Sequence, residues 1–195
     1  MNKIGAEMVL DTTVLNNFLQ AGCVELLQQM PTVAYVCPAV FAEIERGIRL
    51  GKVPSADLEW LPKATLSADE EALAAGLPPR LGAGEAESIA VAYSRNWWLA
   101  TDDRDARRIA ARLRITTTGT VGILVYCVNS RFARLEQTNE LLERMVSAGY
   151  RAPVSRLDEF VRYLCFLRER AAPKPTGTCP PVAKLACYAL TPRVV

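Results

Sequence analysis

The chain has 195 residues, half of them hydrophobic, and a formal net charge of +2. This length and composition suit one globular α/β domain with enough apolar material for a core. The apolar stretches are too short to span a bilayer, and the N-terminus lacks the apolar run and small-residue cleavage site of a signal peptide. We therefore expect a cytoplasmic protein with no membrane contact.

The sequence contains no histidine. This absence excludes Ser-His-Asp and Cys-His nucleophilic sites, histidine general bases and His-ligated zinc. The six cysteines form no Cys-x-x-Cys pair, so we expect reduced thiols rather than disulfides or zinc ligands. Any metal chemistry would depend on oxygen ligands, which favour Mg²⁺ or Mn²⁺.

Charge is distributed unevenly along the chain. Residues 1–105 contain 15 acidic and 8 basic side chains, whereas residues 106–195 contain 6 acidic and 15 basic ones. An acidic half beside a basic half suits a metal-dependent enzyme that acts on a polyanion. The plain alternative is that these charges only solvate helix faces.

The first third of the chain alternates apolar runs with helical patterns. Residues 7–11 predict a buried strand, and one or two helices over 13–29 follow it at once. A β-rich run at 33–37 leads into a helix that begins at Pro38, because proline suits a first helical turn. A further strand is expected near residues 58–61.

The middle of the chain continues this alternation. Residues 67–70 form a capping box, Ser-x-x-Glu, which predicts the start of a helix. Glycines then lead into an alanine-rich helix over 83–96, which is followed by a strand at 97–101. An arginine-rich helix over 104–114 precedes the last expected strand, at 115–118.

The C-terminal part is predicted to be helical and then irregular. Helical patterns cover residues 121–129, 135–149 and 155–170. After residue 171, five prolines in 25 residues favour an irregular segment. We therefore expect one domain over residues 1–170 and a proline-rich tail over 171–195.

Acidic residues recur directly after predicted strands or near helix starts. These acids are Asp11, Glu43, Glu85, Asp102 and Asp103. Because ligands gather at the carboxyl ends of strands in open α/β sheets, the set predicts a shared metal site. Each acid taken alone has an ordinary structural explanation as a helix cap, as compensation of a helix dipole or as a partner of Arg104 or Arg107.

The order of motifs resembles the PIN-domain family. The motifs are a strand followed by Asp-Thr, a Pro-led helix with Glu43, Gly-Glu-Ala-Glu-x-Ile-Ala-x-Ala, Thr-Asp-Asp-x-x-Ala-Arg and Thr-Gly-Thr-x-Gly-Ile-Leu. The resemblance covers about residues 7–150 and is closest to the bacterial and archaeal PIN-like group related to the toxin nucleases of type II toxin–antitoxin pairs. The proline-rich tail departs from the common family pattern.

The resemblance implies a Rossmann-like parallel sheet flanked by helices, with an acidic pocket that binds Mg²⁺ or Mn²⁺. It also implies cleavage of RNA, often by a homodimer with an antitoxin partner. By motif position, the four family acids are Asp11, Glu43, Glu85 and Asp103, and Asp102 is an additional acid whose alignment competes with that of Asp103. Supporting polar groups fall at Thr12, Asp105 and Thr120.

The helix over 104–114 places Arg104, Arg108 and Arg112 on one face, because residues four apart stack on a helix. We expect this face to contact RNA phosphates. The resulting prediction is a metal-dependent endoribonuclease.

Other classes remain open. A non-catalytic PIN-like module could bind RNA or a protein without turnover. A nucleotide-binding Rossmann-like protein would need a glycine-rich loop after the first strand, and the chain has none there. A phosphatase with an aspartyl nucleophile would normally need a second aspartate where Thr13 stands.

Overall fold

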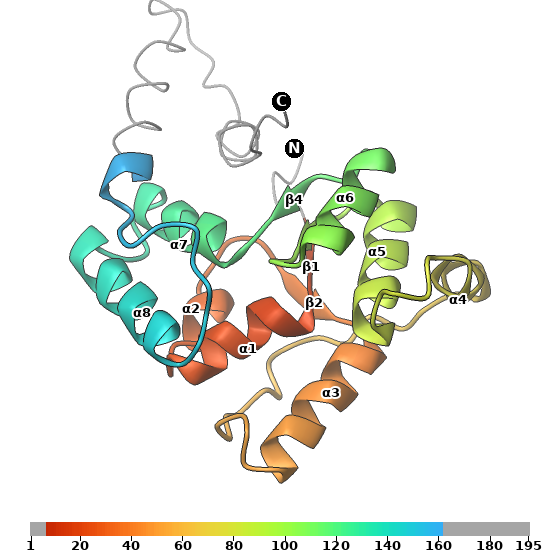
Figure 1. Cartoon of the computed structure of the whole chain (residues 1–195), viewed down its shortest axis with the longest axis horizontal. Helices are drawn as coiled ribbons and strands as arrows, with labels where there is room; N and C mark the ends of the chain where they lie inside the picture. Colours follow the sequence, from red (N-terminus) through yellow and green to blue (C-terminus); the bar gives the residue numbers. More distant parts are fainter. Residues whose placement is uncertain (1–6, 162–195) are drawn as a thin grey trace, which may run out of the picture. The chain divides into compact units, whose positions relative to one another are not determined.

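The computed structural model describes residues 7–161 (Figure 1). The chain divides into two compact units. The first unit extends to Thr120 and the second begins at Val121. The expected boundary between a domain over 1–170 and a tail over 171–195 lies outside the described residues and stays a prediction.

A parallel sheet of four strands, flanked by helices, organises the first unit within the described range. The strands are β1 (Met8–Leu10), β2 (Ala34–Val36), β3 (Trp98–Ala100) and β4 (Thr117–Thr118). Their order is β2-β1-β3-β4, and Val9 of β1 pairs with Tyr35 on one side and Leu99 on the other. This sheet confirms the predicted α/β fold class.

The expected strand at residues 58–61 is wrong. The chain makes a turn there, in which the Leu61 amide donates to the Leu58 carbonyl at 3.0 Å. Only Lys63 makes a single parallel bridge, to Val36. The Pro62 carbonyl accepts from the Val36 amide at 3.1 Å, but proline has no N–H to continue a ladder.

The region between β1 and β2 contains two helices, α1 (Thr12–Gln20) and α2 (Glu25–Gln28). The expected one or two helices over 13–29 are therefore two, and Gly22 between them adopts φ +61°, a backbone conformation that glycine takes without strain. The next helix, α3 (Pro38–Arg49), begins at the proline as expected. It buries Val40 and Ile44, so its apolar stripe faces the core.

Helices α4 (Ala68–Ala75) and α5 (Ala83–Arg95) pack against each other (Figure 1). The capping box of α4 is formed, with the Ser67 amide donating to Glu70 at 2.8 Å and the Glu70 amide donating to the Ser67 hydroxyl at 3.3 Å. Glu70 also accepts from Arg95 of α5, at 2.7 and 2.8 Å. The same carboxylate therefore starts α4 and joins it to α5.

Helix α6 (Arg104–Arg112) lies between β3 and β4 in sequence and buries Ala106, Ile109 and Ala110. Helix α7 (Thr120–Asn129) begins at the last residue of the first unit, and α8 (Leu135–Ser147) belongs to the second. In the second unit Asn139 accepts from the Leu157 amide at 2.8 Å, which fixes the chain after α8.

The predicted helix over 155–170 is described only up to residue 161, and residues 158–161 are helical. No helix within residues 7–161 is both long and apolar enough to cross a membrane. Cys23, Cys37 and Cys127 are buried in the core. Burial raises the pKa of the Cys37 thiol to about 12, which keeps it protonated and unreactive.

Candidate active site

Successive strands are added to opposite sides of β1, so the order in which the chain builds the sheet switches at β1 and β3. The chain passes from β1 to β2 on one side, whereas β3 and β4 lie on the other side of β1. Asp11 directly follows β1, and Asp102 and Asp103 follow β3 after one intervening residue. In open α/β sheets this reversal point is where ligands bind, at the carboxyl ends of the strands.

Asp11 is almost completely buried, with 1% of its surface exposed. One carboxylate oxygen accepts from the Thr12 amide at 2.7 Å, and the other accepts from the hydroxyls of Thr13 at 2.9 Å and Thr101 at 2.8 Å. Burial raises the pKa of Asp11, and the negative charge of Glu43 acts in the same direction, while the three donors oppose the rise. Asp11 is therefore a helix cap and a buried charge at once.

Glu43 of α3 is held next to Asp11 by the neighbouring residue Thr12. The Thr12 hydroxyl donates to a Glu43 carboxylate oxygen at 2.5 Å. Gly84 of α5 makes this approach possible, because a Cβ there would lie 3.1 Å from the Thr12 hydroxyl and 3.3 Å from the Glu43 oxygen. Helices α1, α3 and α5 thus meet at one point.

Glu85 follows this glycine and is half-buried near the start of α5. One carboxylate oxygen accepts from the Gly82 amide at 2.8 Å, so part of its role is to satisfy the helix start. Burial raises the pKa of Glu85, and the negative charges of Asp11, Asp103 and Glu43 raise it further. The four acids lie near enough to influence each other electrostatically.

Asp103 caps α6, because its carboxylate accepts from the Ala106 amide at 2.7 Å. Its own amide donates to the Thr101 hydroxyl at 3.1 Å. The Thr101 hydroxyl therefore accepts from Asp103 while it donates to Asp11, and it joins the ends of β3 and β1.

Asp102 binds a different set of groups. Its carboxylate accepts from the amide and the hydroxyl of Thr120, at 3.1 and 2.6 Å, and from the Asn17 side chain at 3.3 Å. The two neighbouring acids therefore have separate partners, which reduces the cost of holding two carboxylates side by side.

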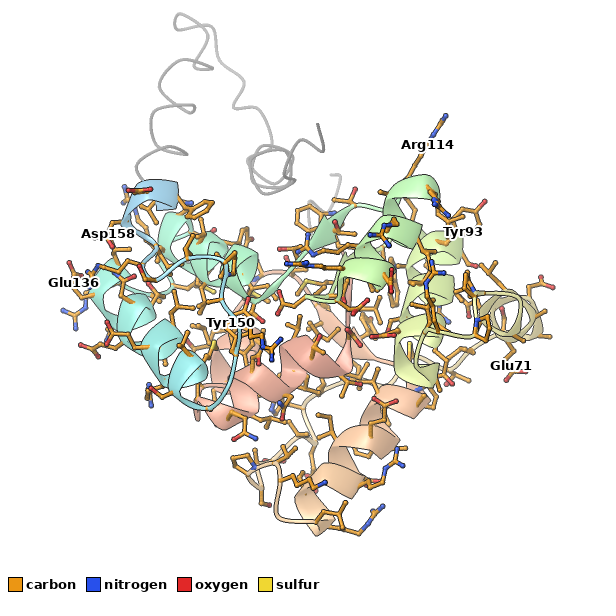
Figure 2. The ribbon with its side chains drawn as sticks, viewed as in Figure 1. Glu71, Tyr93, Arg114, Glu136, Tyr150 and Asp158 are labelled. Carbon is orange, nitrogen blue, oxygen red and sulfur yellow. The ribbon has the colours of Figure 1, made fainter. Side chains whose placement is uncertain are left out.

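The arginines of α6 lie at the surface. Arg104, Arg108 and Arg112 are all exposed, as the helical spacing predicts. The side chain of Arg114, just after the helix, extends away from the ribbon (Figure 2). Asp105, expected to support the acids, instead pairs with Arg108 at 2.7 Å and Arg80 at 3.6 Å.

The donor chemistry of this region suits a hard divalent cation, because carboxylates and hydroxyls surround it. Burial raises the pKa values of Asp11 and Glu85, and the neighbouring negative charges raise both further. Among the described residues, no three Asp, Glu, Cys or His side chains lie close enough together to enclose a metal ion. Mg²⁺ usually keeps several waters and takes only one or two carboxylates from the protein. The residues present fit an ion of that kind, held partly through water.

Three polar residues of this region were not predicted from the sequence. Thr13 and Thr101 orient Asp11, and Asn17 donates to Asp102 and to the Thr120 hydroxyl, the latter at 3.0 Å. The available signal for the threonines was a hydroxyl near a strand end, since Thr101 directly follows β3 and Thr13 lies two residues after Asp11. Asn17 carried no such signal, since it lies within the otherwise buried face of α1.

A family model described as a PIN domain matches residues 7–164 of the chain. No curated protein and no solved structure gives a match.

Proposed function

Because the chain belongs to the PIN-domain family, whose members are generally nucleases, we propose that it is a metal-dependent endoribonuclease. The proposed reaction is hydrolysis of phosphodiester bonds in single-stranded or structured RNA, with Mg²⁺ or Mn²⁺ as cofactor. The proposed setting is cytoplasmic and toxin-like, with a homodimer and an antitoxin protein as partners.

The observation that best supports this proposal is the electrostatic coupling of acids distant in sequence. Burial raises the pKa of Glu85, and the charges of Asp11, Asp103 and Glu43, which come from three other segments of the chain, raise it further. A structural role for each acid alone does not require them to gather. Gathered carboxylates repel one another, and a divalent cation relieves that repulsion.

In this proposal Asp11, Glu43, Glu85 and Asp103 hold the cation, in part through water. A bound Mg²⁺ or Mn²⁺ would polarise the phosphate and lower the pKa of a water near it. The protein's contribution is orientation: Thr13 and Thr101 donate to Asp11, and Thr12 donates to Glu43. These hydroxyls fix the directions in which the remaining carboxylate lone pairs point.

The exposed arginines of α6 supply the proposed RNA contacts. Arg104 follows directly after Asp103, so a phosphate bound there would lie near the acids, and Arg108 and Arg112 continue the same face toward the end of α6. Such contacts position the backbone without reading its sequence.

One observation favours a second candidate, a PIN-like module that binds RNA or a protein without cleaving it. Within residues 7–161 no three acidic side chains form a ready metal-binding group. If this arrangement persists in solution with Mn²⁺ present, the protein would bind RNA and leave it intact.

A cleavage assay separates the two candidates. Linear and circular single-stranded RNAs are incubated with the full chain and Mn²⁺, Mg²⁺ or a chelator. An endonuclease linearises the circle only when metal is present. We expect Asp11→Asn and Asp103→Asn to abolish linearisation, because each removes a charge and keeps the size of the side chain.

The matched control is Glu71→Gln, the same kind of change at an exposed position of α4 (Figure 2). It should retain full activity. An intact circle in every metal condition, together with binding of the same RNA, would establish the non-catalytic module instead.

A further inference from the structure

Asp102 reaches across 18 residues of sequence to the first residue of α7. One carboxylate oxygen accepts from the Thr120 amide at 3.1 Å. The other accepts from the Thr120 hydroxyl at 2.6 Å and from the Asn17 side chain at 3.3 Å. Thr120 is fully buried and Asn17 is nearly so, so these contacts are shielded from water.

Gly119 explains why a distant carboxylate takes this position. The residue before a helix normally satisfies the first amides with its own side chain, and glycine has none to offer. A Cβ at Gly119 would lie 2.4 Å from an Asp102 oxygen and 2.6 Å from an Arg107 nitrogen. The glycine therefore makes room for Asp102, which supplies the missing cap of α7.

The segment after β3 is thus attached at three successive residues. Thr101 donates to Asp11, Asp102 binds Thr120, and Asp103 caps α6 through Ala106. Because the backbone between these anchors is short, movement at Asp102 would displace its neighbour Asp103.

We propose that Asp102 is a positioning residue, which holds Asp103 in place through Thr120, and that it does not bind the metal. This inference rests on the proposed function, since it assigns roles within the same set of acids. Both Asp102 oxygens accept from Thr120, and one of them also accepts from the Asn17 side chain, so these donors direct the carboxylate toward Thr120 and Asn17. Asp103 lies just beyond the end of β3, the strand that pairs with β1.

The test is a double-mutant cycle in Mn²⁺ affinity with Asp102→Asn, Thr120→Val and the double variant. The affinity of the full chain is measured by calorimetry or by the electron paramagnetic resonance signal of unbound Mn²⁺. If Asp102 acts through Thr120, each single change weakens Mn²⁺ binding by about tenfold, as expected for a residue behind the ligands. The double variant then loses about the same tenfold, because the second change breaks an interaction that is already lost.

A direct ligand predicts a different pattern. Thr120→Val would leave Mn²⁺ affinity unchanged, and Asp102→Asn would weaken it equally in either background. That result would overturn the proposal. Thr120→Ser keeps the hydroxyl and should match the wild type in Mn²⁺ affinity, so it controls for loss of folding in the valine variant.

Thermal melts without metal test the contact between Asp102 and Thr120 even if the proposed function is wrong. If the wild type binds no Mn²⁺, the proposed function fails, and the same cycle is measured in melting temperature. Coupled losses in Asp102→Asn and Thr120→Val would still support the anchoring of Asp102 by Thr120. Additive or absent losses would refute it.

Discussion

The hydroxyl of Thr12 donates a 2.5 Å hydrogen bond to the carboxylate of Glu43, across 31 residues of sequence. This bond joins the residue after Asp11, at the start of α1, to an acid in the second turn of α3. It places two acids from separate segments side by side before any metal is bound, so its geometry should control both stability and metal affinity.

Gly84→Ala tests this arrangement, because the added methyl group would lie 2.9 Å from Val40 and 3.1 Å from the Thr12 hydroxyl. We expect destabilisation of about 1–3 kcal/mol from overpacking, measured by urea unfolding. Mn²⁺ affinity should fall as Glu43 is displaced. The matched control is Gly76→Ala at the end of α4, where the nearest atoms are 3.5 Å away and φ is −82°. If Gly84→Ala leaves the free energy of unfolding unchanged, α5 can shift to accommodate the methyl group and the close packing at Gly84 is not required.

Asp11→Asn tests the buried charge in thermal melts without metal. Because the pKa of Asp11 is raised above its ordinary value of 3.8, the native state binds a proton more tightly than the unfolded chain. Wild-type stability therefore falls as pH rises through the window above 3.8, and the asparagine variant lacks this loss. We expect the variant to melt at or above the wild type at pH 7 and to lose this advantage below pH 4.

Added Mn²⁺ should reverse the order of the two melting temperatures, so that the wild type melts above Asp11→Asn. A cation that binds the native acids at a hundredfold excess over its dissociation constant stabilises by about 2.7 kcal/mol. We expect the wild type to gain this in Mn²⁺ melts and Asp11→Asn to gain clearly less. Glu45→Gln, at an exposed position of α3, should gain as much as the wild type. Equal gains in Asp11→Asn and the wild type would mean that Asp11 only caps α1.

Glu70 should give the opposite pH dependence. Hydrogen bonds from Arg95 lower the pKa of the buried Glu70 carboxyl, so its contribution is present at neutral pH and is lost as pH falls through the lowered value. We expect Glu70→Gln to cost about 1.5–3 kcal/mol at pH 7, and much less near pH 2, in urea unfolding. Its exposed neighbour provides the control, since Glu71→Gln should match the wild type at both pH values.

RNA binding should depend on Arg108 and on its partner Asp105. Arg108→Glu should weaken RNA affinity and reduce the salt slope by about one, because one phosphate contact is lost. Asp105→Asn should strengthen binding, because it releases Arg108 and Arg80 from their ion pairs. Filter binding with Asp11→Asn as the background avoids cleavage during the measurement. Unchanged affinity and salt slope in both variants would exclude this face of α6 from the RNA surface.

Local sequence determined where most elements begin and end. Pro38 starts α3, the Ser67–Glu70 box starts α4 and Gly22 separates α1 from α2, because each effect acts within a few residues. The placement of acids directly after strands was equally local. Order of motifs then predicted the PIN-domain family, which the family match confirms.

Tertiary structure decided which groups each polar side chain meets. Asp102 and Asp103 are adjacent and chemically identical, yet one binds Thr120 and the other caps α6. Glu70 was predicted as a helix start, and only the packing of α4 against α5 gave it Arg95. The strand expected at 58–61 is absent because this segment meets β2 only at Lys63, where Pro62 has no N–H to extend the ladder, and the local pattern did not specify that partner.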